Sequence, residues 1–180
     1  STNPADDPIV SWGATENIAC YRGSEDDVLL RVVEAQRFMN SDIVVEICGD
    51  TPLIDPLIID QAISLFEEND CDIVSNTYRL SYPQGIDAQV FRLADLEEIE
   101  RSIHDPAVRE HVSLYFYEHP ERYRLKDLIA PPELTHPEQR LQLDYEDDLS
   151  LIREIYRHLE PEHGDNFGVA ETIAFLEEHP

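Results

Sequence analysis

The stretch SDIVVEICGDTPLIDP, residues 41–56, determines the fold that we expect for this chain. Its run of mainly β-branched residues from 43 to 48 lies between Asp42 and Gly49, which is typical of a strand buried on both faces in a parallel sheet. Asp50 follows directly, at the carboxyl end of this strand, where open α/β sheets bind their ligands. The alternative is that Gly49 and Asp50 form only a turn.

Strands and helices alternate on both sides of this stretch. Asp55 is predicted to cap the next helix, with Pro56 in its first turn. This alternation predicts a parallel sheet with right-handed crossovers, and residues 1–180 are expected to form a single domain. The expected helices cover residues 8–15, 28–39, 57–69, 93–103, 106–117, 146–159 and 169–178, and the expected strands cover 18–22, 43–48, 71–76, 86–91, 122–125 and 141–144.

The composition is that of a globular protein. The 180 residues are 42% hydrophobic, and no apolar run approaches the length of about 18 residues that a membrane span needs. The opening residues are polar and acidic, so no signal peptide is predicted. Cys20, Cys48 and Cys71 form no CxxC pair and are interpreted as buried thiols in a reducing compartment. These features predict a cytoplasmic location.

Acidic residues dominate the charge of the chain. It has 39 Asp and Glu against 13 Lys and Arg, a formal net charge of −26, and its only lysine is Lys126. Such a field repels nucleic-acid phosphates and anionic membranes, so neither is expected as a partner. The acids are spread along the chain, which is typical of a solvated acidic surface. Adaptation to a high-salt cytoplasm is the alternative explanation.

Two acids are predicted at the ends of strands, Asp50 and Asp144, and each is followed by a turn and a helix. Two carboxylates brought together in this way can hold one Mg²⁺, which prefers oxygen ligands and keeps several positions for water and phosphate oxygens. An ion held there would neutralise phosphate charge during nucleotidyl transfer. The alternative for Asp144 is an acid that only precedes, and partly caps, the helix beginning near Glu146.

Four further polar residues are candidates for substrate binding. Arg109 and His111 lie on the helix predicted from residue 106, but residues two apart do not share a helical face. His111 could donate a hydrogen bond to an anionic substrate, although a solvent-facing or core histidine is the more common outcome. Gln84 and Asp87 belong to a segment that forms either a substrate-facing turn or a plain turn into a strand.

Five short strings occur in one order along nearly the whole chain: RGSEDDVL at 22–29, GDTPLIDP at 49–56, YPQGIDAQVF at 82–91, REHVSLY at 109–115 and LDYEDDL at 143–149. Together they resemble the spore coat polysaccharide biosynthesis protein F family, which is similar to the CMP-KDO synthetases and acylneuraminate cytidylyltransferases. The resemblance implies an α/β fold of the nucleotide-diphospho-sugar transferase type, a Rossmann-like three-layer sandwich with a mixed sheet.

The resemblance also implies a reaction, the Mg²⁺-dependent transfer of CMP from CTP to a sugar acid for surface polysaccharide synthesis. Asp50 and Asp144 correspond to the metal-binding acids of the family. His111 and Arg109 would then lie near the sugar, with Gln84 as a further substrate-binding residue beside Asp87. CTP and the sugar acid are the implied partners, with a homodimer as an alternative to a monomer.

One part of the family's pattern has no counterpart in this sequence. Family members begin with a strand and a loop resembling RxGSxRLPGK, which grips the nucleotide triphosphate, whereas residues 1–8 look like the segment after the family's second strand. We therefore expect a domain that lacks its first strands and binds CTP weakly by itself. Two other functions stay open: a glycosyltransferase of similar fold, for which Asp70-Cys71-Asp72 is the only DxD pattern, and a non-catalytic partial domain that binds a partner.

Overall fold

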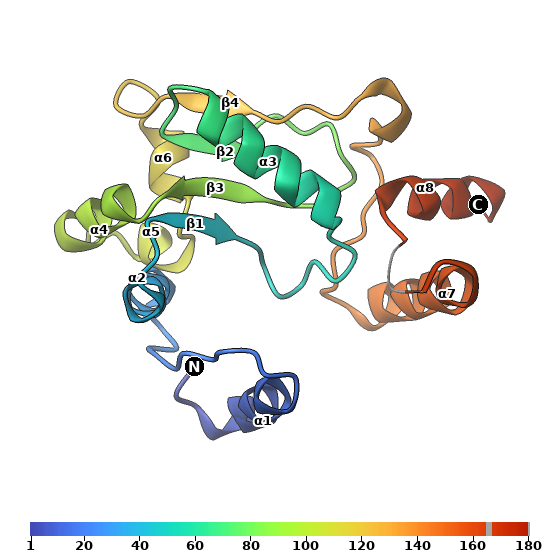
Figure 1. The fold of residues 1–180 in the computed structure, drawn as a ribbon, viewed down its shortest axis with the longest axis horizontal. Coiled ribbons are helices and arrows are strands. Elements are labelled where there is room, and N and C mark those ends of the chain that lie inside the picture. The colour runs from blue at the N-terminus through green and yellow to red at the C-terminus, as the bar shows by residue number, and fades with distance from the viewer. Residues whose placement is uncertain (165–166, 180) are drawn as a thin grey trace. The chain divides into compact units, whose positions relative to one another are not determined.

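The computed structural model of the protein describes residues 1–164 and 167–179 (Figure 1). Short 3-10 helices cover Pro4–Asp6 and Pro132–Leu134. The strands are β1 (Ile43–Glu46), β2 (Ile73–Ser75), β3 (Gln89–Arg92) and β4 (Leu125–Asp127). The helices are α1 (Asp7–Thr15), α2 (Val28–Met39), α3 (Pro56–Glu68), α4 (Leu93–Ser102), α5 (Pro106–Glu110), α6 (Leu114–Glu118), α7 (Glu146–His163) and α8 (Val169–Glu178).

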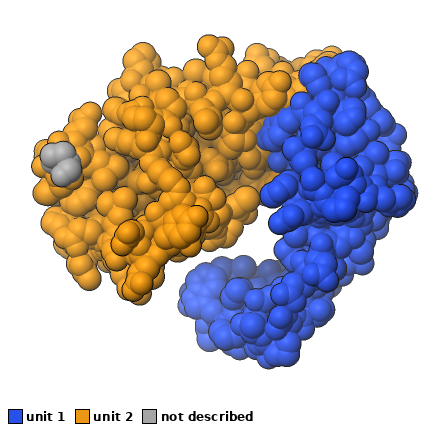
Figure 2. Space-filling view, turned by 180° about the vertical axis from the view of Figure 1, so that it is seen from behind, with its two compact units in different colours: residues 1–44, 91–123 blue, residues 45–90, 124–180 orange. Residues whose placement is uncertain are grey.

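The chain divides into two compact units, each built from two segments of sequence (Figure 2). Unit 1 comprises residues 1–44 and 91–123, and unit 2 comprises residues 45–90 and 124–180. The chain passes from one unit to the other within β1 and again within β3.

The four strands form one mixed sheet in the order β1-β3-β2-β4. Strands β2 and β4 run parallel, with Ile73 opposite Leu125 and Ser75 opposite Asp127. All three residues of β2 are buried, as expected for a strand covered on both faces. The expected α/β fold with a mixed sheet is confirmed.

Helix α3 shows how the apolar pattern builds the core of unit 2. Its buried residues Ile58, Ala62 and Phe66 recur at helical spacing and lie on the stripe predicted from the sequence. Together with buried residues such as Val74 they form the apolar core, and α3 packs against β2. In unit 1, α2 packs against α4 and α5 and buries its apolar residues Leu29 and Val33.

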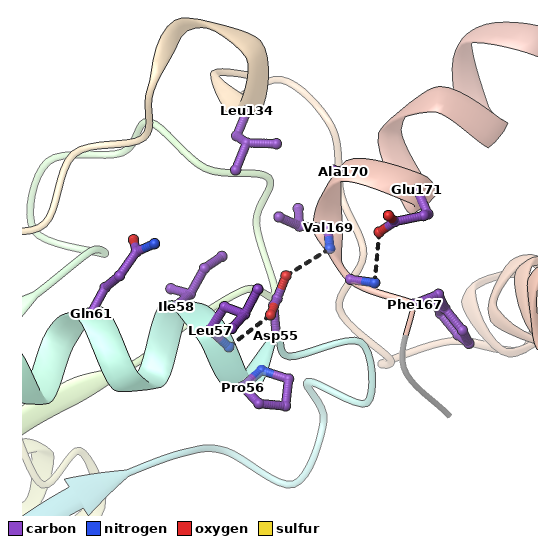
Figure 3. A pocket seen from close by; sticks show the side chains of 11 residues that line it. Asp55, Pro56, Leu57, Ile58, Gln61, Leu134, Phe167, Val169, Ala170 and Glu171 are labelled. Atoms are coloured by element: carbon purple, nitrogen blue, oxygen red, sulfur yellow. Dashed lines mark hydrogen bonds between the residues drawn. The ribbon is translucent and has the colours of Figure 1, made fainter. Parts of the chain in front are cut away.

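Asp55 joins the first turns of two helices in unit 2 (Figure 3). One oxygen of its carboxylate accepts a 2.8 Å hydrogen bond from the amide of Leu57 in α3, and the other accepts a 3.0 Å bond from the amide of Val169 in α8. The predicted N-cap is therefore confirmed, and it serves a second helix as well. A Cβ at Gly168 would collide with this carboxylate, so the close approach of α8 needs glycine there. A cavity of about 410 Å³ lies beside the two helix starts.

The strand predicted at residues 18–22 is absent. The amide of Ile18 donates to the carbonyl of Gly13 at 2.7 Å, which fastens this segment to the end of α1, and the Ile18 side chain is 51% exposed. The strand predicted at 141–144 is also absent, and the only sheet-like pairing next to it is an isolated bridge between Gln84 and Arg140, directly before the segment. Local β-branched and alternating patterns do not form strands where no neighbouring strand pairs with them.

Strand β1 is less buried than predicted. It ends at Glu46, and only Val44 in it is fully buried, whereas Ile43 and Ile47 are each 39% exposed. Because β1 stands at one end of the strand order, its side chains have strand neighbours on one side only. The expectation of a strand buried on both faces was therefore wrong for this strand.

The helix predicted over 106–117 is divided into α5 and α6. The amide of His111 closes the last turn of α5 by donating to Ala107 O at 2.8 Å, and a turn leads into α6. The other predicted elements are present with shifted ends: β3 begins at Gln89 rather than 86, and β4 begins at Leu125 rather than 122. Within the described residues, no helix combines the length and apolar character needed to cross a membrane.

Candidate active site

The loop after β1 carries Asp50, whose carboxylate is held at one oxygen. Its Oδ2 accepts a 2.6 Å hydrogen bond from the side-chain amide of Gln142, and its backbone carbonyl accepts a 2.8 Å bond from the amide of Leu143. Its Oδ1 is buried and has no hydrogen-bond donor among the described residues. A buried carboxylate oxygen without a partner is costly in an apo protein, so this atom fits a bound cation.

Asp144 follows the segment that contacts Asp50, but its side chain is engaged elsewhere. It forms an ion pair with Arg140, and 41% of its side chain is exposed. Arg140 also binds Asp148 at 2.6 Å, so one guanidinium bridges two carboxylates. The structure thus brings the segment of Asp144 beside the Asp50 loop, while Arg140 holds the Asp144 carboxylate.

Asp148, rather than Asp144, supplies the acid at the start of α7. Its Oδ2 accepts hydrogen bonds from the amides of Asp144 at 2.9 Å and Tyr145 at 2.8 Å. The Arg140 guanidinium, with these backbone donors, lowers the pKa of Asp148 to about 2. The residue at the N-cap position is Tyr145, so the alternative that Asp144 caps this helix is wrong.

Gln84 and Gly85 form a turn that supports the same region. The Gln84 side-chain amide donates to the carbonyl of Pro137 at 3.1 Å, and its backbone carbonyl accepts from the amide of Leu141 at 2.7 Å. Gly85 has φ of +93°, and a Cβ there would lie 2.6 Å from the amide nitrogen of Gln142. In this structure the polar groups of Gln84 position the segment that carries Gln142.

Three acids create a negative potential around the end of β1. Burial and the negative charge of Asp50 raise the pKa of Asp87, against a backbone hydrogen bond at Gly85 that lowers it. Although Cys48 as a residue is exposed, burial of its thiol and the charges of Glu46, Asp50 and Asp87 raise its pKa to about 11. A site with this potential favours cations and keeps Cys48 protonated at neutral pH.

Arg109 belongs to unit 1, where its charge is neutralised by two acids. Its Nε donates to Asp27 at 3.0 Å, its Nη2 forms a second contact with the same carboxylate, and its Nη1 donates to the carbonyl of Glu100 at 2.8 Å. The Arg109 side chain is only 16% exposed. These contacts join α5 to the start of α2 and to α4, which favours a structural role for Arg109 over sugar binding.

His111, also in unit 1, occupies the position directly after α5. The residue is exposed. Its amide makes the last hydrogen bond of α5, and its carbonyl oxygen accepts a 2.9 Å hydrogen bond from the amide of Leu114. Its imidazole is therefore accessible to a ligand. Asp50, Asp87 and Asp144 lie in unit 2.

A metal ion held by Asp50 and Asp144 would need further ligands from water or from the substrate. Among the described residues, no three His, Cys, Asp or Glu side chains are grouped to hold a metal by themselves. Two carboxylates would leave positions for water and phosphate oxygens, which suits Mg²⁺. The residues present thus fit an ion that is completed by its substrate.

Gln142, Arg140 and Asp148 were missed by the sequence analysis. A signal for Gln142 existed: in an extended Leu141-Gln142-Leu143-Asp144 segment, alternate side chains share a face, which places Gln142 with the predicted ligand Asp144. Arg140 and Asp148 flank Asp144 by four residues on either side, but sequence spacing alone did not show that both side chains turn toward it.

A family model described as cytidylyltransferase matches residues 6–171 of the chain. The chain belongs to the cytidylyltransferase family. This cytidylyltransferase fold is Rossmann-like: a solved structure of a cytidylyltransferase from Leptospira borgpetersenii matches with a TM-score of 0.93 and 25% identity, over 100% of this chain and 74% of that one. The family resemblance and fold class expected from the sequence are confirmed.

Two curated proteins are also similar to this chain. It is 31% identical over 175 residues to the uncharacterized protein MJ1063 of Methanocaldococcus jannaschii, covering 97% of this chain and 70% of that protein. It is 30% identical over 158 residues to the spore coat polysaccharide biosynthesis protein SpsF of Bacillus subtilis, covering 87% of this chain and 65% of that protein.

The acids of the only DxD pattern, Asp70 and Asp72, are both paired with Arg124. Arg124 forms an ion pair with Asp70 and binds Asp72 through Nη2 at 2.8 Å, while its backbone amide also donates to Asp72 at 2.8 Å. Both acids therefore anchor the residue before β4. Together with the family match, this arrangement favours the cytidylyltransferase over the glycosyltransferase.

Proposed function

We propose that this chain carries the metal-binding part of an enzyme that transfers CMP from CTP to a sugar acid. The observation that carries the proposal is the buried, unpartnered Oδ1 of Asp50 beside the segment of Asp144, in a member of the cytidylyltransferase family. The relation to a protein of spore coat polysaccharide biosynthesis supports a role in surface polysaccharide synthesis. The reaction would take place in the cytoplasm.

The chemistry is an in-line displacement at phosphorus. A hydroxyl oxygen of the sugar acid forms a bond to the α-phosphorus of CTP, and the bond from that phosphorus to the bridging oxygen breaks. Pyrophosphate leaves with the bonding electron pair, and the hydroxyl proton passes to solvent. When bound, Mg²⁺ neutralises the charge that builds up on the phosphate oxygens.

The residues of the chain would position these reactants. Asp50 and Asp144 would hold Mg²⁺, with Gln142 fixing the Asp50 carboxylate so that Oδ1 stays available. The exposed part of Asp144 can face the ion while Arg140 retains the other side. Within unit 2, Asp87 is the proposed contact to the sugar acid, and His111 of unit 1 remains a separate candidate for binding an anion.

Pyrophosphate release from CTP tests this proposal. The chain is incubated at high CTP with Mg²⁺ and a panel of sugar acids that includes KDO and N-acetylneuraminate. Asp50→Asn removes the proposed ligand, and Asp60→Asn, an exposed acid on α3, is the matched control. Release that needs both Mg²⁺ and a sugar acid, and is lost only in Asp50→Asn, supports the proposal. Equal release by both variants, or release that does not need Mg²⁺, contradicts it.

A further inference from the structure

Several histidines and glutamates line a hollow between α7 and α8 of unit 2, and Asp50 and Asp144 are not among the lining residues. These helices pack against each other and form an open hollow of about 280 Å³ on the surface. Three of the seven histidines of the chain line it: His158 and His163 from α7, and His179 directly after α8. The lining also contains three glutamates, Glu162, Glu171 and Glu178, and no Lys or Arg.

The tautomers of two of these histidines are fixed by the backbone. His158 Nδ1 lies 2.9 Å from the carbonyl oxygen of Glu154, and His179 Nδ1 lies 2.9 Å from the carbonyl oxygen of Phe175. Because a carbonyl oxygen can only accept, each Nδ1 must carry the proton in the neutral ring. The lone pair is then on Nε2 in both rings. Metal-binding histidines show this same arrangement, with one ring nitrogen donating to a carbonyl and the other binding the ion.

The two rings are also close enough to share one ion. Their centroids lie 5.5 Å apart. Imidazoles bound to one tetrahedral Zn²⁺ at about 2.0–2.1 Å have ring centroids roughly 5 Å apart. The buried Phe175 contacts both rings. Its ring centroid lies 4.9 Å from that of His158 and 4.5 Å from that of His179, so it restricts the orientation of both imidazoles. This packing reduces the entropy that two surface side chains would lose on binding.

We propose that His158 and His179 bind one divalent transition-metal ion, such as Zn²⁺ or Ni²⁺, through their Nε2 atoms. Imidazole nitrogen suits these ions and not Mg²⁺, which prefers oxygen. Because no three potential ligands are grouped in the described residues, water completes the coordination, and the affinity is below that of a four-ligand structural zinc site. The surrounding glutamates raise the local concentration of cations. The ion would tie the end of α8 to the middle of α7.

Calorimetric titration of the untagged chain with NiCl₂ tests this site, with the same titration in Mg²⁺ as a comparison. The variants are His158→Gln and His179→Gln, which keep a polar side chain of similar reach. His104→Gln, an exposed histidine in unit 1, is the matched control. Circular dichroism of each variant confirms that it is folded, and melting temperatures with and without Ni²⁺ give a second readout.

We expect one Ni²⁺ per chain, a loss of affinity of about tenfold or more in each of the two variants, and no change in His104→Gln. Ni²⁺ should raise the melting temperature of the unmodified chain and of the control, and not of a variant that combines His158→Gln with His179→Gln. The proposal is overturned if the unmodified chain takes up no stoichiometric Ni²⁺. It is equally overturned if both histidine variants bind Ni²⁺ as tightly as the control, which would place the ion elsewhere.

Discussion

Gln142 donates a 2.6 Å hydrogen bond to Asp50 across 92 positions of sequence. This bond orients the carboxylate and leaves the second oxygen, Oδ1, buried without a donor. Two chain segments that look unrelated in the sequence therefore define one carboxylate position.

Replacing Gln142 with Ala should destabilise the protein. The change removes the donor to a partly buried carboxylate, and a lost hydrogen bond to a charged group costs about 1.5–3 kcal/mol. The free energy of unfolding from urea titrations measures the effect. Gln61→Ala, at an exposed position on α3, should change it by less than about 0.5 kcal/mol. Equal stability of the two variants would mean that the bond to Asp50 contributes little.

Replacing Asp87 with Asn should stabilise the protein at neutral pH. The pKa of this carboxyl is raised in the folded state by burial and by Asp50, so the folded protein binds its proton more tightly than the unfolded chain. Stability is consequently lost as the pH rises from the ordinary value of 3.8 through the raised pKa. Urea unfolding at pH 7 should show the gain, and it should vanish well below pH 3.8. A variant that is less stable at pH 7 would refute the assignment.

Replacing Arg140 with Gln should raise the pKa of Asp148 and so reduce the stability that is lost in acid. Arg140 is the main cause of the low pKa of Asp148, about 2, so its removal should move that pKa up toward 3.8. A lowered pKa gives stability that is present above 3.8 and is lost as the pH falls toward about 2. The variant should therefore lose less stability in that acid range. Carboxyl-carbon NMR titration measures the pKa. Arg157→Gln, which removes a different ion pair on α7, should leave it unchanged.

Three glycine variants separate the cost of an unfavourable backbone conformation from the cost of a steric clash of the added Cβ. Gly49→Ala should be nearly neutral, because a Cβ there meets nothing within 4 Å. Gly164→Ala meets no atom within 4 Å, but its φ of +61° and ψ of −145° lie near a region populated almost only by glycine, which should cost at least about 1 kcal/mol. Gly85→Ala combines a positive φ with a clash against Gln142 and should cost at least about 2 kcal/mol. Thermal and urea unfolding rank the three, and an order other than this one would show that the 141–142 backbone yields easily.

Salt should stabilise the folded chain. At a net charge of −26, like charges repel across the whole surface, and added salt shortens the range of that repulsion. We expect the melting temperature to rise markedly from dilute buffer to molar KCl. A melting temperature that stays constant over that range would remove the hypothesis of adaptation to a high-salt cytoplasm.

The sequence predicted elements well where its apolar spacing matched a helix. The stripes of α2 and α3 place Leu29, Val33, Ile58 and Phe66 in the interior, and each is buried. It predicted strands less well, because strand formation depends on a partner: Ile18 has the right residue type and is bonded to α1 instead.

The sequence predicted the acids of the candidate site but not the side chains that bind them. Asp50 lies in the loop after β1, four residues beyond its end and not directly at it as the strand pattern indicated, and the segment of Asp144 lies beside that loop. The partners of these acids were not predictable from spacing, because Gln142 and Arg140 reach them through side-chain directions that depend on tertiary packing. Arg109 illustrates the same limit, since its acids Asp27 and Glu100 come from other helices.

The shared carboxylate of Asp55 has a consequence for how this protein can evolve. A Cβ at position 168 would lie 2.3 Å from Asp55 Oδ2 while Asp55 binds both helix starts, and Asp55 would keep only its bond to the amide of Leu57 if α8 moved away. A substitution at either position alone would therefore be selected against, and the two would be expected to change together among related chains. The acid at 55 and the glycine at 168 thus constrain each other, although more than a hundred residues separate them.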